Sequence, residues 1–166
     1  EVALPILLHY HMTATFYIYT DVIGSPLFMT IDQLRALTSV HMEIGGHTKH
    51  HSKLSKISPY RYKEELEDSK KTLEKNLPVQ VVDFAYPYGM YNEKVIKALK
   101  KYGYLSGRTS KKGIINDFKD PFDIKVLYAP DDIEGFRRML EPVPKMESHK
   151  PILHGRIQPL RELARL

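Results

Sequence analysis

The chain has 166 residues, of which 42% are apolar and 27% charged, and it carries a formal net charge of +5. These proportions are typical of a globular protein of about one domain and exclude a disordered or fibrous chain. The absence of cysteine excludes disulfides and thiolate metal sites, and no run approaches the roughly 18 uninterrupted apolar residues of a membrane span.

The first fifty residues alternate between helical and extended patterns. Apolar side chains recur at helical spacing at the start of the chain, and a run of β-branched and aromatic residues follows, as in a buried strand. Thr30 can cap the next helix, and a short strand then runs into Gly45-Gly46. The predicted elements are a helix, a strand, a helix and a strand over residues 2–12, 14–19, 31–40 and 42–44.

A second series of elements begins at Ser58, a capping residue followed by proline at the first helical position. This helix is predicted to reach Leu77, because Pro78 stops it. Asn92 can cap a later helix that ends at Gly103. The remaining predicted elements are strands over residues 81–85, 104–109 and 124–129 and a last helix over residues 131–141.

Alternation of strands and helices predicts a parallel sheet with helices outside, as a barrel or as a doubly wound sheet. The strand spacing of roughly 25–40 residues suits crossover connections. The predicted domain covers residues 1–141. Residues 142–166 are rich in proline and predict an extended tail with a short helix over residues 159–166.

Basic residues concentrate in residues 94–112, which hold seven lysines and arginines and no acid. Such a patch can attract an anionic polymer. However, Val95, Ile96 and Leu99 recur at helical spacing opposite the charges, which favours the solvated face of a helix. The pattern lacks the aromatic interleaving that single-strand binders use. We therefore expect no nucleic-acid partner.

The segment His47–Ser52 (HTKHHS) directly follows a predicted strand, at the edge where parallel α/β sheets build their sites. His47 and His51 are four residues apart, so one helical turn would bring both imidazoles to the same side. This spacing suits one divalent metal, and His50 would then point elsewhere, as a surface histidine. The alternative is a polar loop that binds nothing, as most such histidine pairs do.

The segment Phe84–Asn92 (FAYPYGMYN) runs from a strand into a proline turn, a glycine and a helix cap. Such a turn can leave the Tyr88 amide unpaired and directed inward, as a donor to a developing oxyanion. The alternative is an aromatic-rich turn that only packs against the strand end.

Together, the two segments resemble motifs of the polysaccharide deacetylase family, the metal-dependent carbohydrate esterases of NodB-homology type. His47–Ser52 matches the family's His-Ser/Thr-x-x-His motif, and Phe84–Gly89 matches the branch that reads Phe-Ala-Tyr-Pro-Tyr-Gly. Residues 14–16 and 42–45 resemble the neighbouring strands, and the likeness covers about residues 1–141. The resemblance implies an α/β fold, a distorted (β/α) barrel, and hydrolysis of N-acetyl or O-acetyl groups of a polysaccharide.

The sequence departs from the family at its first motif, Thr-Phe-Asp-Asp-Gly, which supplies an acidic metal ligand and the catalytic base. No Asp-Asp pair precedes Ala14, and residues 4–12 resemble the helix that follows this motif. We therefore expect a barrel that lacks its first strand in this chain, with the motif either upstream in the native protein or lost. Asp131-Asp132 lies at a predicted helix start and is expected to cap that helix.

The resemblance also implies a mechanism and a set of residues that carry it out. A divalent metal, expected to be zinc and held by His47 and His51, polarises the acetyl carbonyl and a water molecule. The Tyr88 amide stabilises the oxyanion. The family's acid lies in a Leu-x-His motif, loosely matched at residues 152–154, which makes His154 the candidate acid. The candidate substrate-binding residues are Tyr86, Pro87 and Tyr91.

The leading hypothesis is thus a deacetylase of an amino-sugar polymer, and two alternatives stay open. One is a non-catalytic relative that binds a glycan and has lost the Asp-Asp motif. The other is a basic envelope protein that uses residues 94–112 to bind anionic polymers. The resemblance implies a secreted or envelope location. It is the sole basis for this expectation, since the chain has no signal-like segment. With two histidines as its metal ligands, the chain alone is expected to be weakly active or inactive.

Overall fold

The structure is a computed structural model that describes residues 2–113 and 120–140. It divides into two compact units, Glu1–Tyr128 and Ala129–Leu166. The predicted domain boundary after residue 141 and the short helix predicted over residues 159–166 lie outside the described residues, so both stay predictions. No helix in residues 2–113 and 120–140 has the length and apolar character needed to cross a bilayer.

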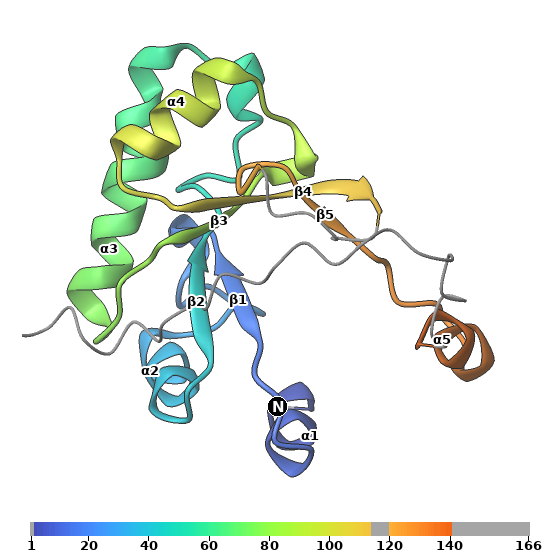
Figure 1. Cartoon of the computed structure of the whole chain (residues 1–166). Coiled ribbons are helices and arrows are strands. Elements are labelled where there is room, and N and C mark those ends of the chain that lie inside the picture. The colour runs from blue at the N-terminus through green and yellow to red at the C-terminus, as the bar shows by residue number, and fades with distance from the viewer. Residues whose placement is uncertain (1, 114–119, 141–166) are drawn as a thin grey trace, which may run out of the picture. The chain divides into compact units, whose positions relative to one another are not determined.

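The first unit is built on a five-stranded sheet in which every neighbouring pair of strands is parallel (Figure 1). The strands lie in chain order, as consecutive strands do in a (β/α) barrel. They are β1 (Thr15–Ile18), β2 (Glu43–Gly46), β3 (Asp83–Ala85), β4 (Ser106–Lys112) and β5 (Ile124–Val126). This arrangement confirms the predicted α/β fold with a parallel sheet.

The helices of the first unit lie where the sequence predicted helices, with one local difference. They are α1 (Ala3–His9), α2 (Ile31–Ser39), α3 (Ser69–Asn76) and α4 (Glu93–Lys101). The helix predicted from Ser58 to Leu77 is in fact three segments. A 3₁₀ turn (Pro59–Arg61) leads into a π-helical segment, η4 (Lys63–Asp68), before α3 begins.

Alternate residues of the strands face opposite sides of the sheet. On one side, Ile18, Ile44 and Phe84 are buried in the hydrophobic core. The helices complete this core with side chains that are almost fully buried, among them Leu34, Leu66, Leu73, Val95 and Leu99. On the other side, Tyr17 packs over Gly45, where a Cβ atom would lie 2.5 Å from the tyrosine ring.

The second unit contains α5 (Ile133–Leu140) in its described part. The Gly135 amide donates a hydrogen bond of 2.7 Å to Oδ1 of Asp132. Asp132 therefore caps this helix, as the sequence predicted.

The start of α2 offers a test of how the sequence sets a helix boundary. The Gln33 amide donates to Oγ1 of Thr30 at 3.2 Å, and the Thr30 amide donates to Oε1 of Gln33 at 2.8 Å, which makes a reciprocal capping box. We expect Thr30→Ala to lower the free energy of unfolding by about 1 kcal/mol in urea denaturation. Thr38→Ala, in the last turn of the same helix, is the control, and an equal loss from both variants would contradict this role of Thr30.

Candidate active site

The two segments singled out in the sequence lie side by side at the carboxyl ends of neighbouring strands. β2 ends at Gly46, which pairs with Phe84 of β3. His47 follows β2 directly, and the proline turn Pro87–Gly89 begins two residues after β3 ends. Parallel strands of an α/β fold present their sites at this edge.

His47 and His51 face each other across a short gap. Their ring centroids are 4.8 Å apart at an angle of 61°. Nδ1 of His47 lies 2.7 Å from the carbonyl oxygen of Ala85, so this nitrogen carries the proton and Nε2 is left as a potential metal ligand. Burial, together with the nearby His51, lowers the pKa of His47. Both effects favour the neutral imidazole that binds metals.

The route by which the two rings meet differs from the prediction. Residues 47–52 form an irregular loop, so the expected helical turn is wrong. Thr48 and His51 instead adopt positive φ values of 70° and 57°, and these two reversals bring the imidazoles together. The loop is also tied to the segment after β1, because the Asp21 amide donates to the carbonyl oxygen of Lys49 at 3.0 Å.

The Tyr88 turn packs directly against this histidine pair. The rings of Tyr88 and His51 have centroids 4.8 Å apart, and Tyr88 is 59% exposed. Nζ of Lys53 lies 4.7 Å from the centroid of the Tyr88 ring. Tyr88 has φ 58° and ψ 14°, a left-handed conformation. Within residues 2–113 and 120–140 its amide donates no hydrogen bond.

Two of the three candidate substrate-binding residues are buried, although contact with a substrate would need exposed side chains. Tyr86 is 3% exposed and Pro87 is fully buried. The hydroxyl of Tyr86 donates to the carbonyl oxygen of Phe122 at 3.1 Å, and its ring stacks on Tyr91 at 4.6 Å. Burial raises the pKa of Tyr86 well above its usual value, so the hydroxyl stays a neutral donor. The burial of Tyr86 and Pro87 argues against direct contact with a substrate in this conformation.

Tyr91 is partly buried, and its contacts occupy both its ring and its hydroxyl. One face stacks on Tyr86, and the hydroxyl lies 2.8 Å from Oδ1 of Asp123. Nζ of Lys111 approaches the same carboxylate at 3.0 Å. These contacts hold the segment after the turn against β4 and β5. His154, the candidate acid, lies outside the described residues.

Two polar residues near the site have contacts that the sequence analysis did not predict. Glu65, which the sequence analysis did not single out, is fully buried and contacts the loop between the two histidines. His50, expected at the surface, keeps a partly exposed ring but places Nδ1 3.0 Å from Oε1 of Glu65. An acid in a charged helical run resembles a surface residue, so composition alone could not have identified Glu65.

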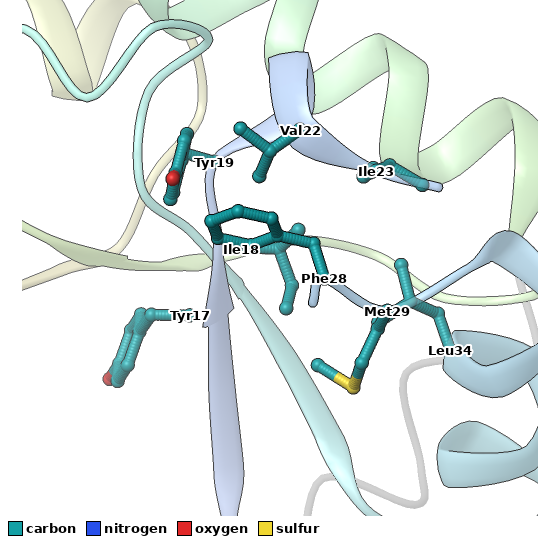
Figure 2. Close-up of a pocket in the computed structure, with 8 residues that line it drawn as sticks. All are labelled: Tyr17, Ile18, Tyr19, Val22, Ile23, Phe28, Met29 and Leu34. Carbon is teal, nitrogen blue, oxygen red and sulfur yellow. The ribbon is translucent and has the colours of Figure 1, made fainter. Parts of the chain in front are cut away.

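An apolar cavity of about 210 Å³ lies beside the site (Figure 2). Tyr19 connects the two, because its ring packs against His51 at 5.2 Å and against Phe28 at 5.7 Å. The other lining residues are Tyr17, Ile18, Val22, Ile23, Met29 and Leu34. Tyr17 points to the opposite side of β1 from Phe28 and Met29.

The donor set fits part of a metal site. Two neutral imidazoles are suitable ligands for zinc and similar divalent ions. In the part of the chain that the structure describes, no group of three or more His, Cys, Asp or Glu side chains is placed to hold a metal. His47 and His51 therefore fit two positions of a metal site, and a complete site needs at least one more ligand.

Comparisons with known proteins agree with the motifs. A family profile described as "Polysaccharide deacetylase" matches residues 1–107. YxkH of Bacillus subtilis (strain 168) is 33% identical over 111 residues, which cover 67% of this chain and 40% of that protein. The poly-β-1,6-N-acetyl-D-glucosamine N-deacetylase of Staphylococcus epidermidis (strain ATCC 35984) is 29% identical over 147 residues, which cover 80% of this chain and 51% of that protein.

Among solved structures, the Streptococcus pyogenes deacetylase PplD in complex with acetate superposes with a TM-score of 0.75 and 31% identity. The match covers 85% of this chain and 64% of PplD. The chain thus spans about half or less of the length of the two curated relatives. The profile match over residues 1–107, the two motifs and the parallel fold together establish that the chain belongs to the polysaccharide deacetylase family.

Proposed function

We propose that the protein hydrolyses N-acetyl or O-acetyl groups of an amino-sugar polysaccharide, with a divalent metal held in part by His47 and His51. The observation that carries this proposal is the meeting of His47, His51 and Tyr88 at the carboxyl ends of β2 and β3, with successive ring centroids 4.8 Å apart. Family membership supports the same reaction. Zinc is the metal we propose, because neutral imidazoles suit it.

Each candidate residue would have one role in the proposed hydrolysis. When bound, a divalent metal supplies Lewis acidity toward an acyl carbonyl and toward water. His47 uses Nε2 as a ligand while Ala85 fixes its tautomer through Nδ1. The Tyr88 amide, free of other partners among the described residues, donates to the oxyanion. His154 would protonate the departing amine of an N-acetyl group or the departing alkoxide of an O-acetyl group.

The exposed Tyr88 ring, with Lys53 beside it, is the aromatic surface that we propose for contact with a sugar ring. Tyr86, Pro87 and Tyr91 would act indirectly, by packing the turn that presents Tyr88. A relative acts on poly-β-1,6-N-acetyl-D-glucosamine, and we propose a polymer of this chemical class as the substrate. Such polymers lie in the cell envelope or outside the cell, which is the location we propose.

A non-catalytic relative that binds a glycan is the second candidate. It is favoured by one observation: the described residues supply two metal ligands and no third. A catalyst must turn over an acetylated oligomer, whereas a binding protein holds the oligomer without releasing acetate. Measuring binding and acetate release on the same sample separates the two.

We expect residues 1–166 alone to release acetate from chitin oligomers slowly or not at all in the presence of zinc. The physical reason is that two imidazoles hold zinc weakly and that no Asp-Asp pair precedes Ala14 to supply a base. Acetate release is measured with and without added zinc, and a His47→Ala variant gives the background. Brisk zinc-dependent turnover by this chain would show that the missing acidic motif is not required.

A further inference from the structure

Glu65 is an acid enclosed by the fold. It lies in the π-helical segment η4 and is fully buried. Buried carboxylates are costly unless they are paired and hydrogen-bonded. The surroundings of Glu65 supply these partners, and most of them come from the loop that carries the two candidate metal ligands.

Each carboxylate oxygen of Glu65 binds part of that loop. Oε2 accepts the backbone amides of Lys49 at 3.2 Å and His50 at 3.1 Å. Oε1 accepts the Ser52 hydroxyl at 2.7 Å. Nδ1 of His50 and Nη2 of Arg61 lie 3.0 Å and 3.1 Å from the same oxygen. The carboxylate thus fixes the backbone between His47 and His51 and the residue that follows.

The charge of Glu65 is maintained in this enclosed position. Burial by itself would raise the pKa of Glu65, but hydrogen bonds from Ser52 and His50 lower it below its usual value. Glu65 also lies within a π-helical segment, a feature that is frequent at functional sites. The hydroxyl of Ser69 donates to the carbonyl oxygen of Glu65 at 2.8 Å and satisfies the backbone at this turn.

The loop needs such an anchor because its conformation is unfavourable on its own. Thr48 and His51 flank the anchored amides and both adopt positive φ values, which non-glycine residues adopt rarely. Without bonds to Lys49 and His50, nothing else among the described contacts holds both amides in place. Bonds from the Thr20 and Asp21 amides hold the carbonyl oxygens of Thr48 and Lys49, whereas the amides of Lys49 and His50 are held by Glu65.

We propose that Glu65 is a positioning residue that sets the His47–His51 geometry and, through it, the affinity of the site for a divalent metal. The first part concerns the loop itself, and the second part rests on the proposed function. Glu65 touches neither imidazole of the pair, so it acts through the backbone of the loop and through Ser52.

The test compares Glu65→Gln with Glu64→Gln. Both changes remove one negative charge from the same helical turn, but Glu64 contacts only side chains, including Nζ of Lys49 at 2.9 Å. In Glu65→Gln the side-chain NH₂ group can only donate, yet it would face the donors of Arg61 or of the loop backbone. Part of the hydrogen bonding that holds the loop is therefore lost. We expect zinc affinity, measured by calorimetry, to fall about 10- to 100-fold in Glu65→Gln, the range of lost outer-shell partners, and to change less than twofold in Glu64→Gln.

A second readout needs no metal. Nuclear Overhauser contacts between the ring protons of His47 and His51 report their separation, and we expect them to weaken in Glu65→Gln and to persist in Glu64→Gln. Leu73→Ala, in the core at α3, controls for general destabilisation and should retain these contacts. If Glu65→Gln fails to fold, Ser52→Ala removes one of the loop's contacts with Glu65 and should give a smaller loss of affinity and of ring contacts.

The outcomes separate the two proposals. Ring contacts without zinc binding in the unmodified chain would overturn the proposed metal site, while the effect of Glu65→Gln on those contacts would still decide the positioning role. Unchanged ring contacts in Glu65→Gln would overturn the positioning role. Equal losses in Glu65→Gln and Leu73→Ala would also overturn it, because they would indicate a purely structural effect.

Discussion

His47→Ala and His51→Ala are each expected to lower zinc affinity more than about 100-fold, beyond the usual range for outer-shell changes. The reason is direct: the two rings face each other with centroids 4.8 Å apart and are the only pair of imidazoles in the described loop placed to share an ion. His50→Ala should change the affinity only a few-fold, since its ring is directed to Glu65. Isothermal calorimetry with zinc chloride on the whole chain measures all three.

The comparison among the three histidines carries its own control. All three substitutions remove one imidazole from the same five-residue stretch, so nonspecific zinc binding would be lost equally. Circular dichroism should show the same fold in each variant. Equal loss of affinity in all three variants would mean that His47 and His51 are not the ligands.

Phe84→Ala is expected to lower the free energy of unfolding by about 3–5 kcal/mol, the range found for large aromatic residues in cores. Phe84 lies on β3 and is 0% exposed. Its ring packs against Tyr104 at 5.1 Å and against Tyr86 at 5.6 Å. Alanine would leave a cavity beside the rings of Tyr86 and Tyr104. Urea denaturation followed by circular dichroism measures the change.

Phe28→Ala is the matched control for that experiment. Phe28 is 44% exposed and contacts Tyr19 at the rim of the apolar cavity, so the same chemical change removes less buried surface. We expect it to lower the free energy of unfolding by about 1 kcal/mol or less. Losses of similar size in the two variants would show that the centre of the core does not lie at Phe84.

The strength of the local signal explains which elements the sequence predicted. The β-branched and aromatic residues around Phe16 identify β1, and the capping residues Thr30 and Asn92 place the starts of α2 and α4 correctly. β4 was predicted over residues 104–109 but spans Ser106–Lys112. Its final lysines have little intrinsic preference for a strand, and pairing with β5 places them there.

The candidate site was predicted in its residue types but not in its details. Spacing suggested that His47 and His51 meet, yet a helical turn was the wrong route, because the positive φ values of the loop have no signature in non-glycine residues. The break of the long helix into η4 and α3 was missed, since apolar spacing is compatible with a continuous helix. The burial of Tyr86 depends on Phe122, which is distant in sequence.

Three non-glycine residues adopt a left-handed backbone conformation near the carboxyl ends of β2 and β3. They are Thr48, His51 and Tyr88. Such conformations cost of order 1–3 kcal/mol each and persist only where surrounding structure over-determines them. The free energy of folding therefore covers this conformational cost before any ligand binds. An incoming ion or sugar would therefore lose little of its binding free energy to moving these three residues into left-handed conformations.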